Sequence, residues 1–147
     1  MSVRMKIGIP DIELQNLNPI YHKNVEKACE LIKYEKSIIP KKEMVLITSS
    51  DQAGSLKVLV DSNHIISQAS HHGCSSILQK GVLDELCRII IGLPILELGD
   101  HGGILLENSI RDDSLKRPVS GVVLPQNADQ IFRLPLLLTR EILDQYR

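Results

Sequence analysis

The chain has 147 residues, a formal net charge of −1 and 43% hydrophobic residues, enough apolar surface for one domain with its own core. Aromatic residues make up only 3% and Trp is absent, so few rings are available to stack on nucleobases or to anchor at a lipid surface. Because there is no basic stripe and no apolar run long enough for a signal peptide or a membrane span, we expect neither nucleic acid nor a membrane as partner.

Cysteine usage predicts the compartment. The three cysteines, Cys29, Cys74 and Cys87, are an odd number scattered along the chain. That usage does not suit a disulfide framework and favours a reducing environment, so we expect a cytoplasmic protein. Cys29 and Cys87 lie in the apolar stripes of predicted helices, and we expect them to be packing residues.

The first half of the chain predicts one helix and three strands. Asn18 and Pro19 form a typical helix start, and apolar residues then recur at helical spacing over residues 18–36. Beyond Pro40, short β-branched runs at 44–47, 56–60 and 64–69 predict strands. Turn-like sequences join these strands, which therefore should pair antiparallel.

The second half predicts mainly helices. Apolar residues follow a helical period from Ser75 to Gly92, although Gly81 inside this stretch costs about 1 kcal/mol relative to Ala, which packing must offset. An extended piece at 95–98, a glycine-rich turn at 99–103 and a helix at 104–111 are expected next, then a strand at 121–124 and a helix at 135–145. These elements predict a single α+β domain over 1–147, with a small antiparallel three-stranded sheet packed by helices.

The most suggestive chemical group is the thiol of Cys74, in the segment Ser70-His71-His72-Gly73-Cys74. It follows the predicted third strand and precedes the long helix, where unpaired backbone N–H groups and the helix dipole favour an anion. We therefore expect a lowered thiol pKa and a reactive or metal-binding group. The alternative is a small residue that packs the corner. His71 and His72 should point to opposite faces of their strand, so at most one approaches the thiol.

Two further segments carry candidate ligands. Asp100 and His101 lie between glycines that would let a ligand approach the backbone, although the same segment could simply cap the next helix. Asp51, in the polar segment 49–55, is either a ligand or the acceptor of an Asx turn.

Parts of the chain resemble the U-type iron–sulfur cluster assembly scaffolds, the family of IscU and the NifU N-terminal domain. The stretches VLVDSNHIISQASHHGCSS (58–76) and DELCRIIIG (84–92) are similar to the scaffold's hairpin, second cysteine and following helix. The stretch ELGDHGGILLENSIRD (97–112) is similar to its His-Cys turn and next helix. The resemblance covers residues 45–112 as a scaffold-like core, so the N-terminal helix at 18–36 and a C-terminal extension at 119–147 lie outside it.

The resemblance implies a site built from three cysteines, an aspartate and a histidine. Of these positions, only Cys74 and His101 carry the family's residue; the others hold Ala53, Ser55 and Gly102. An iron–sulfur cluster usually takes four ligands.

Zinc or a cluster at this site would therefore need Asp51, Asp100, His72 or a second subunit of a homo-oligomer to complete the ligand set. The related SufE-type sulfur acceptors need only one thiol, so the resemblance is also compatible with a persulfide on Cys74. It implies a cysteine desulfurase or another cluster-assembly protein as partner.

Three functions remain open from the sequence. The first is a metal-binding or sulfur-carrier protein of iron–sulfur metabolism that uses Cys74 with His101. The second is a regulatory or interaction module that has the scaffold fold without its chemistry. The third is a cysteine-nucleophile enzyme with His72 or His101 as base and Asp100 as the residue that orients it; of enzyme and non-enzyme, we favour the non-enzyme.

Overall fold

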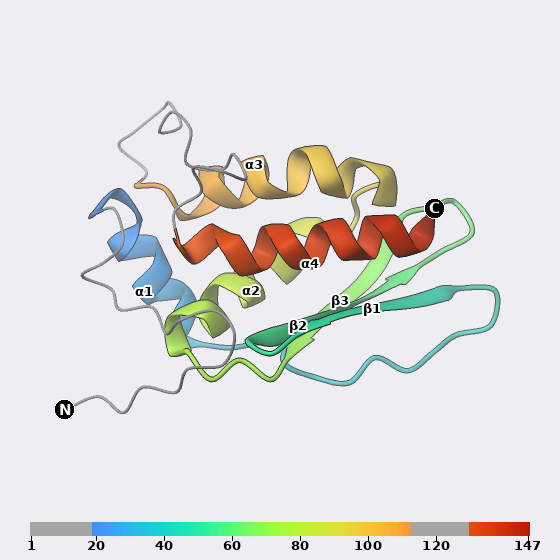
Figure 1. The fold of residues 1–147 in the computed structure, drawn as a ribbon, viewed down its shortest axis with the longest axis horizontal. Coiled ribbons are helices and arrows are strands. Elements are labelled where there is room, and N and C mark those ends of the chain that lie inside the picture. Colours follow the sequence, from blue (N-terminus) through green and yellow to red (C-terminus); the bar gives the residue numbers. More distant parts are fainter. Residues whose placement is uncertain (1–18, 113–129) are drawn as a thin grey trace.

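The computed structural model describes residues 19–112 and 130–147, and it shows an α+β fold around one antiparallel sheet (Figure 1). The predicted fold class is therefore confirmed. In chain order the elements are the 3-10 turn η2 (Pro19–Tyr21), α1 (His22–Glu30), β1 (Val45–Asp51), β2 (Gly54–Val60), β3 (Ile66–His72), α2 (Ile77–Ile90), the 3-10 turn η3 (Ile95–Glu97), α3 (Leu98–Ile110) and α4 (Gln130–Tyr146).

The sheet has the strand order β1-β2-β3, and each strand is longer or further along the chain than predicted. The polar segment 49–55 is not a loop, because Ser50 pairs with Ser55 and Asp51 with Gly54 across a tight turn. Serine and aspartate have low strand propensity, but cross-strand pairing overrides it here. The extra length carries β1 and β2 as far as the corner where Cys74 lies.

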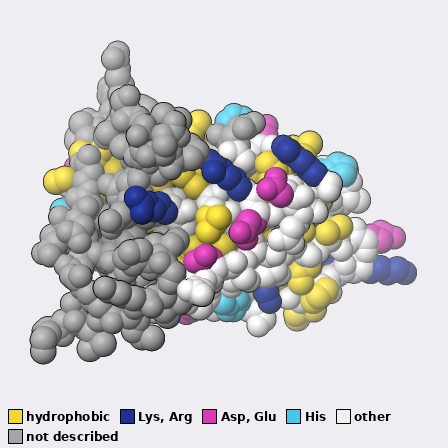
Figure 2. All heavy atoms as spheres, in the orientation of Figure 1, with side chains coloured by type: hydrophobic (Ala, Val, Ile, Leu, Met, Phe, Trp, Pro, Cys, Tyr) yellow, Lys and Arg dark blue, Asp and Glu magenta, His cyan; other side chains and the backbone are white. Residues whose placement is uncertain are grey.

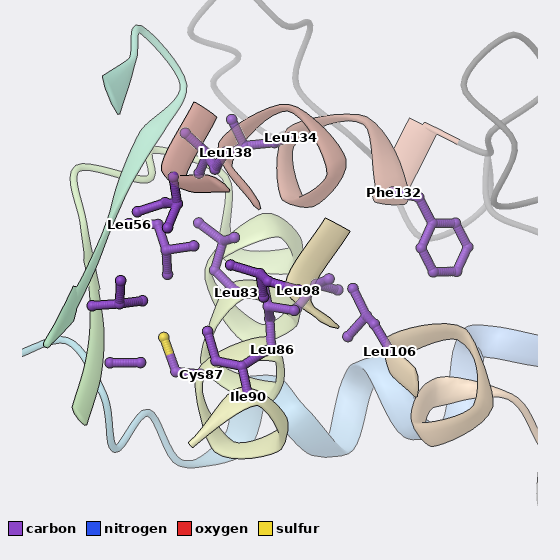
Figure 3. Packing of buried hydrophobic residues seen from close by; sticks show 14 of the residues in the cluster. Leu56, Leu83, Leu86, Cys87, Ile90, Leu98, Leu106, Phe132, Leu134 and Leu138 are labelled. Atoms are coloured by element: carbon purple, nitrogen blue, oxygen red, sulfur yellow. The ribbon is translucent and has the colours of Figure 1, made fainter. Parts of the chain in front are cut away.

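The core lies between the sheet and the helices on one of its faces, with α2 and α4 packed directly against the strands (Figure 1). Figure 3 shows Leu56 of β2 opposite Leu134 and Leu138 of α4, with Leu83 of α2 beneath them. Burying each such side chain stabilises the fold by about 1.5–3 kcal/mol. Cys87 lies in the same cluster and is fully buried, which confirms its predicted packing role.

The glycine-rich segment 99–103 is part of α3 and not the predicted turn. A Cβ at Gly99 would lie 2.6 Å from Leu143 Cδ2, and one at Gly103 would lie 2.7 Å from Leu136 Cδ2. These glycines therefore let α3 approach α4 closely, which explains them without any ligand. The propensity cost of glycine in a helix is offset by this packing.

Several element ends also differ from the expectation. Helix α1 ends at Glu30, and the chain then runs extended beside β3, where the His71 amide donates to the Tyr34 carbonyl at 3.0 Å. Residues 95–97 form a 3-10 turn rather than an extended piece, and Pro135 lies inside α4 rather than at its start. The predicted cap Asn18 and the strand at 121–124 lie outside the described residues.

The described surface carries both charge signs. On the face shown in Figure 2, basic and acidic side chains are interspersed. Among the helices that the structure describes, none combines the length and the apolar composition that crossing a bilayer requires.

Gly81 provides a test of the packing between α1 and α2. A Cβ at this position would lie 2.4 Å from Cys29 Sγ and 3.0 Å from the Cys29 backbone nitrogen. We expect Gly81→Ala to destabilise the protein by about 1–3 kcal/mol because the two helices must separate, although alanine alone favours a helix by about 1 kcal/mol. Urea unfolding measures the change.

Gly102→Ala is the matched control, because its Cβ would meet nothing nearer than Leu98 Cδ1 at 3.4 Å. We expect it to be neutral or to stabilise the protein by up to about 1 kcal/mol. Equal gains in stability from both substitutions would contradict the close contact between α1 and α2.

Candidate functional site

Cys74 lies in an apolar corner between the β1–β2 hairpin and α4. Its side chain is 8% exposed. A Cβ on Gly54 would lie 2.7 Å from the Cys74 sulfur and 3.3 Å from Leu134 Cδ2, so hairpin, thiol and α4 meet at this point. The backbone reaches the corner through Gly73, whose φ of 80° favours glycine. Because Gly54 has no side chain, the Cys74 sulfur can pack directly against the backbone of the hairpin.

The predicted low thiol pKa is wrong. Burial raises the pKa of Cys74 to about 11, and the nearby Lys80 only partly opposes this. Removing the thiolate from water therefore outweighs the attraction of the helix start. In addition, the α2 N-cap Ser76 already accepts the Gln79 amide at 3.3 Å, so the helix start is satisfied by its own cap.

The two neighbouring histidines point to opposite faces of β3, as predicted. His71 is fully buried on the face toward α2, and its Nε2 donates to Asp84 Oδ1 at 3.0 Å. His72 lies on the other face and donates from Nε2 to the Lys36 carbonyl at 2.9 Å. Both rings are therefore committed to partners other than the Cys74 thiol.

The structure does not place His101 beside Cys74. Helix α2 has 14 residues and is therefore about 20 Å long. Cys74 precedes its first residue, whereas α3 starts beyond its far end (Figure 1). The His101 side chain is 56% exposed and lies 4.0 Å from Glu97 on its own helix. The helix that does reach the thiol corner is α4.

The remaining predicted ligands are also dispersed. Asp51 Oδ2 accepts the Ala53 amide at 3.0 Å, the Asx turn that was the alternative to a ligand role. The side chain of Asp100 lies outside what the structure describes. Among the described side chains, no three His, Cys, Asp or Glu residues are grouped as a metal ion would require.

A second site was missed by the sequence analysis. It is a cleft of about 520 Å³ between α1, the segment after it, α2 and α3. It is lined by Asn24, Lys27, Ala28, Glu30, Leu31, Lys33, Tyr34, Asp84, Glu85, Arg88 and Ser109. Its volume is typical of pockets that hold small molecules.

Asp84 is the buried acid of this cleft. It accepts the Lys33 amide at 3.1 Å, the Tyr34 amide at 2.7 Å and His71 Nε2 at 3.0 Å. With Nε2 as the donor to Asp84, Nδ1 is the acceptor of a neutral ring, and it has no hydrogen-bond partner among the described residues. The only sequence signal was an acidic residue in a mostly apolar helix, and nothing local connects it to a histidine 13 residues earlier.

The side of the cleft between α2 and α3 is held by ionic contacts and hydrogen bonds. Arg88 donates to both carboxylate oxygens of Glu85, at 2.6 and 3.0 Å, and Ser109 also donates to Glu85. Burial raises the pKa of Glu85, but the hydrogen bonds from Arg88 and Ser109 outweigh it and hold that pKa below its usual range. Glu85 therefore stays charged and fixes the position of the arginine.

The buried His71 predicts acid sensitivity. Burial lowers the pKa of His71 below 6.5, although the hydrogen bond and charge of Asp84 and the charge of Glu35 oppose the shift. The unfolded chain therefore binds this proton more readily, so the contribution to stability is complete above about pH 6.5 and is lost as pH falls toward the folded-state pKa. We expect the free energy of unfolding to fall below pH 6.5 by up to about 1.4 kcal/mol per pH unit.

Urea unfolding between pH 5 and 8 measures this slope. His71→Gln, which can still donate to Asp84, should flatten it, whereas His101→Gln at an exposed position should leave it unchanged. A slope that His71→Gln does not alter would show that the neutral His71 is not its source.

Comparison with known proteins adds no family. No protein-family model matches the chain, and no curated protein matches it.

Proposed function

We propose that this chain is a binding or interaction module that has the fold of the U-type iron–sulfur scaffolds without their cluster chemistry. The observation that carries the proposal is the apolar burial of the Cys74 thiol, with its pKa raised to about 11. A scaffold or sulfur acceptor needs a thiolate that metal or polarised sulfur can reach. At pH 7.5 such a pKa leaves roughly one thiolate in a few thousand molecules.

The hairpin next to the thiol supports the resemblance and also the loss of chemistry. Ala53 and Ser55, at the positions where the resemblance implies a cysteine and an aspartate, flank the Gly54 that contacts Cys74. The two segments that would share a ligand site therefore lie together, but only one of them supplies a thiol. Leu134 of α4 approaches from the third side and contributes only apolar atoms.

A sulfur acceptor that works with a cysteine desulfurase is the second candidate function. One observation favours it: Cys74 follows Gly73 in the connection between β3 and α2, only three residues before α2 begins. A modest movement of the β1–β2 hairpin would expose the sulfur there. One thiol is sufficient for this chemistry.

Alkylation of the thiol separates the two candidates. Because a pKa of about 11 replaces the ordinary 9.0, the thiolate is rarer at pH 8 although each thiolate is more nucleophilic. We therefore expect Cys74 to react with iodoacetamide at least about tenfold more slowly than an unperturbed thiol. Peptide mass spectrometry resolves Cys74 from Cys29 and Cys87, and the same protein in urea provides the unperturbed rate. A native rate equal to the rate in urea would favour the sulfur acceptor.

Metal and sulfur loading give an independent result. We expect Cys74→Ser and the natural chain to purify with equal and substoichiometric zinc and iron, because the described ligands do not converge. Incubation with a cysteine desulfurase and cysteine should leave Cys74 without persulfide. Stoichiometric metal that the substitution removes, or persulfide on Cys74, would overturn the binding-module proposal.

A further inference from the structure

The cleft between α1, α2 and α3 has a separate chemistry from the thiol corner. None of its lining residues is a cysteine, and its volume of about 520 Å³ exceeds what a few water molecules need. Its walls combine charged groups of both signs with the apolar surfaces of Ala28, Leu31 and Tyr34. The positions of the charges indicate what kind of molecule fits.

Asp84 forms the negative pole of the cleft. Its Oδ1 accepts from Tyr34 and His71, and the Lys33 amide is shared between Oδ1 and Oδ2 at 3.1 Å; within the described parts of the chain, Oδ2 has no other donor. A carboxylate oxygen can accept about two hydrogen bonds, so Oδ2 has capacity for a donor from the cleft. The contacts on Oδ1 hold the carboxylate in position for that donor.

Lys27 and Arg88 form the positive side of the cleft, where the carboxylate of Glu85 pairs with Arg88 and balances its charge. Arg88 lies four residues after Asp84 on α2, which places the two on one side of the helix, with Cβ atoms about 6 Å apart. Arg88 does not pair with Asp84, because Glu85 and Ser109 hold its guanidinium. Within the described part of the chain, no ion pair is formed by Lys27, although it lies near enough to Glu85 to lower that carboxyl's pKa.

We propose that this cleft binds a small zwitterion of the α-amino acid class. The ligand's ammonium donates to Asp84 Oδ2, its carboxylate lies against Lys27 and Arg88, and its side chain lies along the apolar wall. A simple anion would face Asp84, and a simple cation would face Lys27 and Arg88. A molecule that carries both charges within a few ångströms matches both poles.

The test is calorimetric titration of the full chain with the standard free L-amino acids. We expect at least one to bind with a dissociation constant of about 1 mM or tighter. The N-acetyl derivative of that amino acid, which lacks the ammonium, and its amide, which lacks the carboxylate, should each bind at least about tenfold more weakly. No binding by any of them at about 10 mM, or equal binding by the N-acetyl derivative or by the amide, would overturn the proposal.

Two variants locate the binding. Arg88→Gln and Lys27→Gln change half-exposed and exposed side chains and should each weaken binding about tenfold. Lys57→Gln on β2, outside the cleft, is the matched control and should bind as the natural chain does. Unchanged binding in both cleft variants would place the ligand elsewhere and refute the proposal.

The amino-acid site is distinct from the Cys74 thiol, so the two proposals can be tested separately. Cys74→Ser should retain amino-acid binding, because Cys74 does not line the cleft. A persulfide on Cys74 would overturn the binding-module proposal but would not affect the amino-acid proposal. Absence of calorimetric binding would overturn the amino-acid proposal but would not affect the conclusion about the Cys74 thiol.

Discussion

The buried carboxylate of Asp84 is the interaction on which much of the structure depends. It joins three segments of the chain: α2 itself, β3 through His71, and the stretch after α1 through two backbone amides. Each hydrogen bond to a charged group of this kind contributes about 1.5–3 kcal/mol, and a buried carboxylate left without its donors costs more than a neutral group would. The Tyr34 carbonyl in turn accepts the His71 amide, so the same contacts hold the extended segment against the edge of β3.

The raised pKa of the Cys74 thiol follows from a comparison of two energies, the attraction of a helix start for a thiolate and the cost of burying that thiolate. A charge at a helix start gains about 0.3–1 kcal/mol, rarely more than 2. The rise of the thiol pKa from 9.0 to about 11 corresponds to roughly 2.7 kcal/mol against the thiolate. Burial between Gly54 and Leu134 is thus the larger effect. Position in the sequence predicted the helix start correctly, but it contained no measure of how closely the hairpin and α4 would cover it.

Sequence patterns predicted what depends on local periodicity. The α+β class, the pairing of the strands, the opposite directions of His71 and His72, and the helix after Cys74 all follow from alternation or helical spacing. The failures occurred where tertiary contacts override local preference. Segment 99–103 was expected to be a turn because glycine disfavours helices, but Gly99 and Gly103 are required for the approach of α4.

The pairing of the charged residues in the cleft also could not be predicted from local sequence alone. Arg88 follows Asp84 by four residues and Glu85 by three on α2. Helical spacing alone therefore allows Arg88 to pair with either acid. Ser109 of α3 and the amides of Lys33 and Tyr34 decide the outcome, since they fix Glu85 beside Arg88 and turn Asp84 toward His71. Each of these contacts comes from another segment, which is why α2 alone could not predict them. Arg88 and Asp84 are held by different partners and do not pair with each other. Because Glu85 balances the charge of Arg88, Lys27 supplies the positive charge that the carboxylate of a zwitterion requires, and Asp84 supplies the negative one.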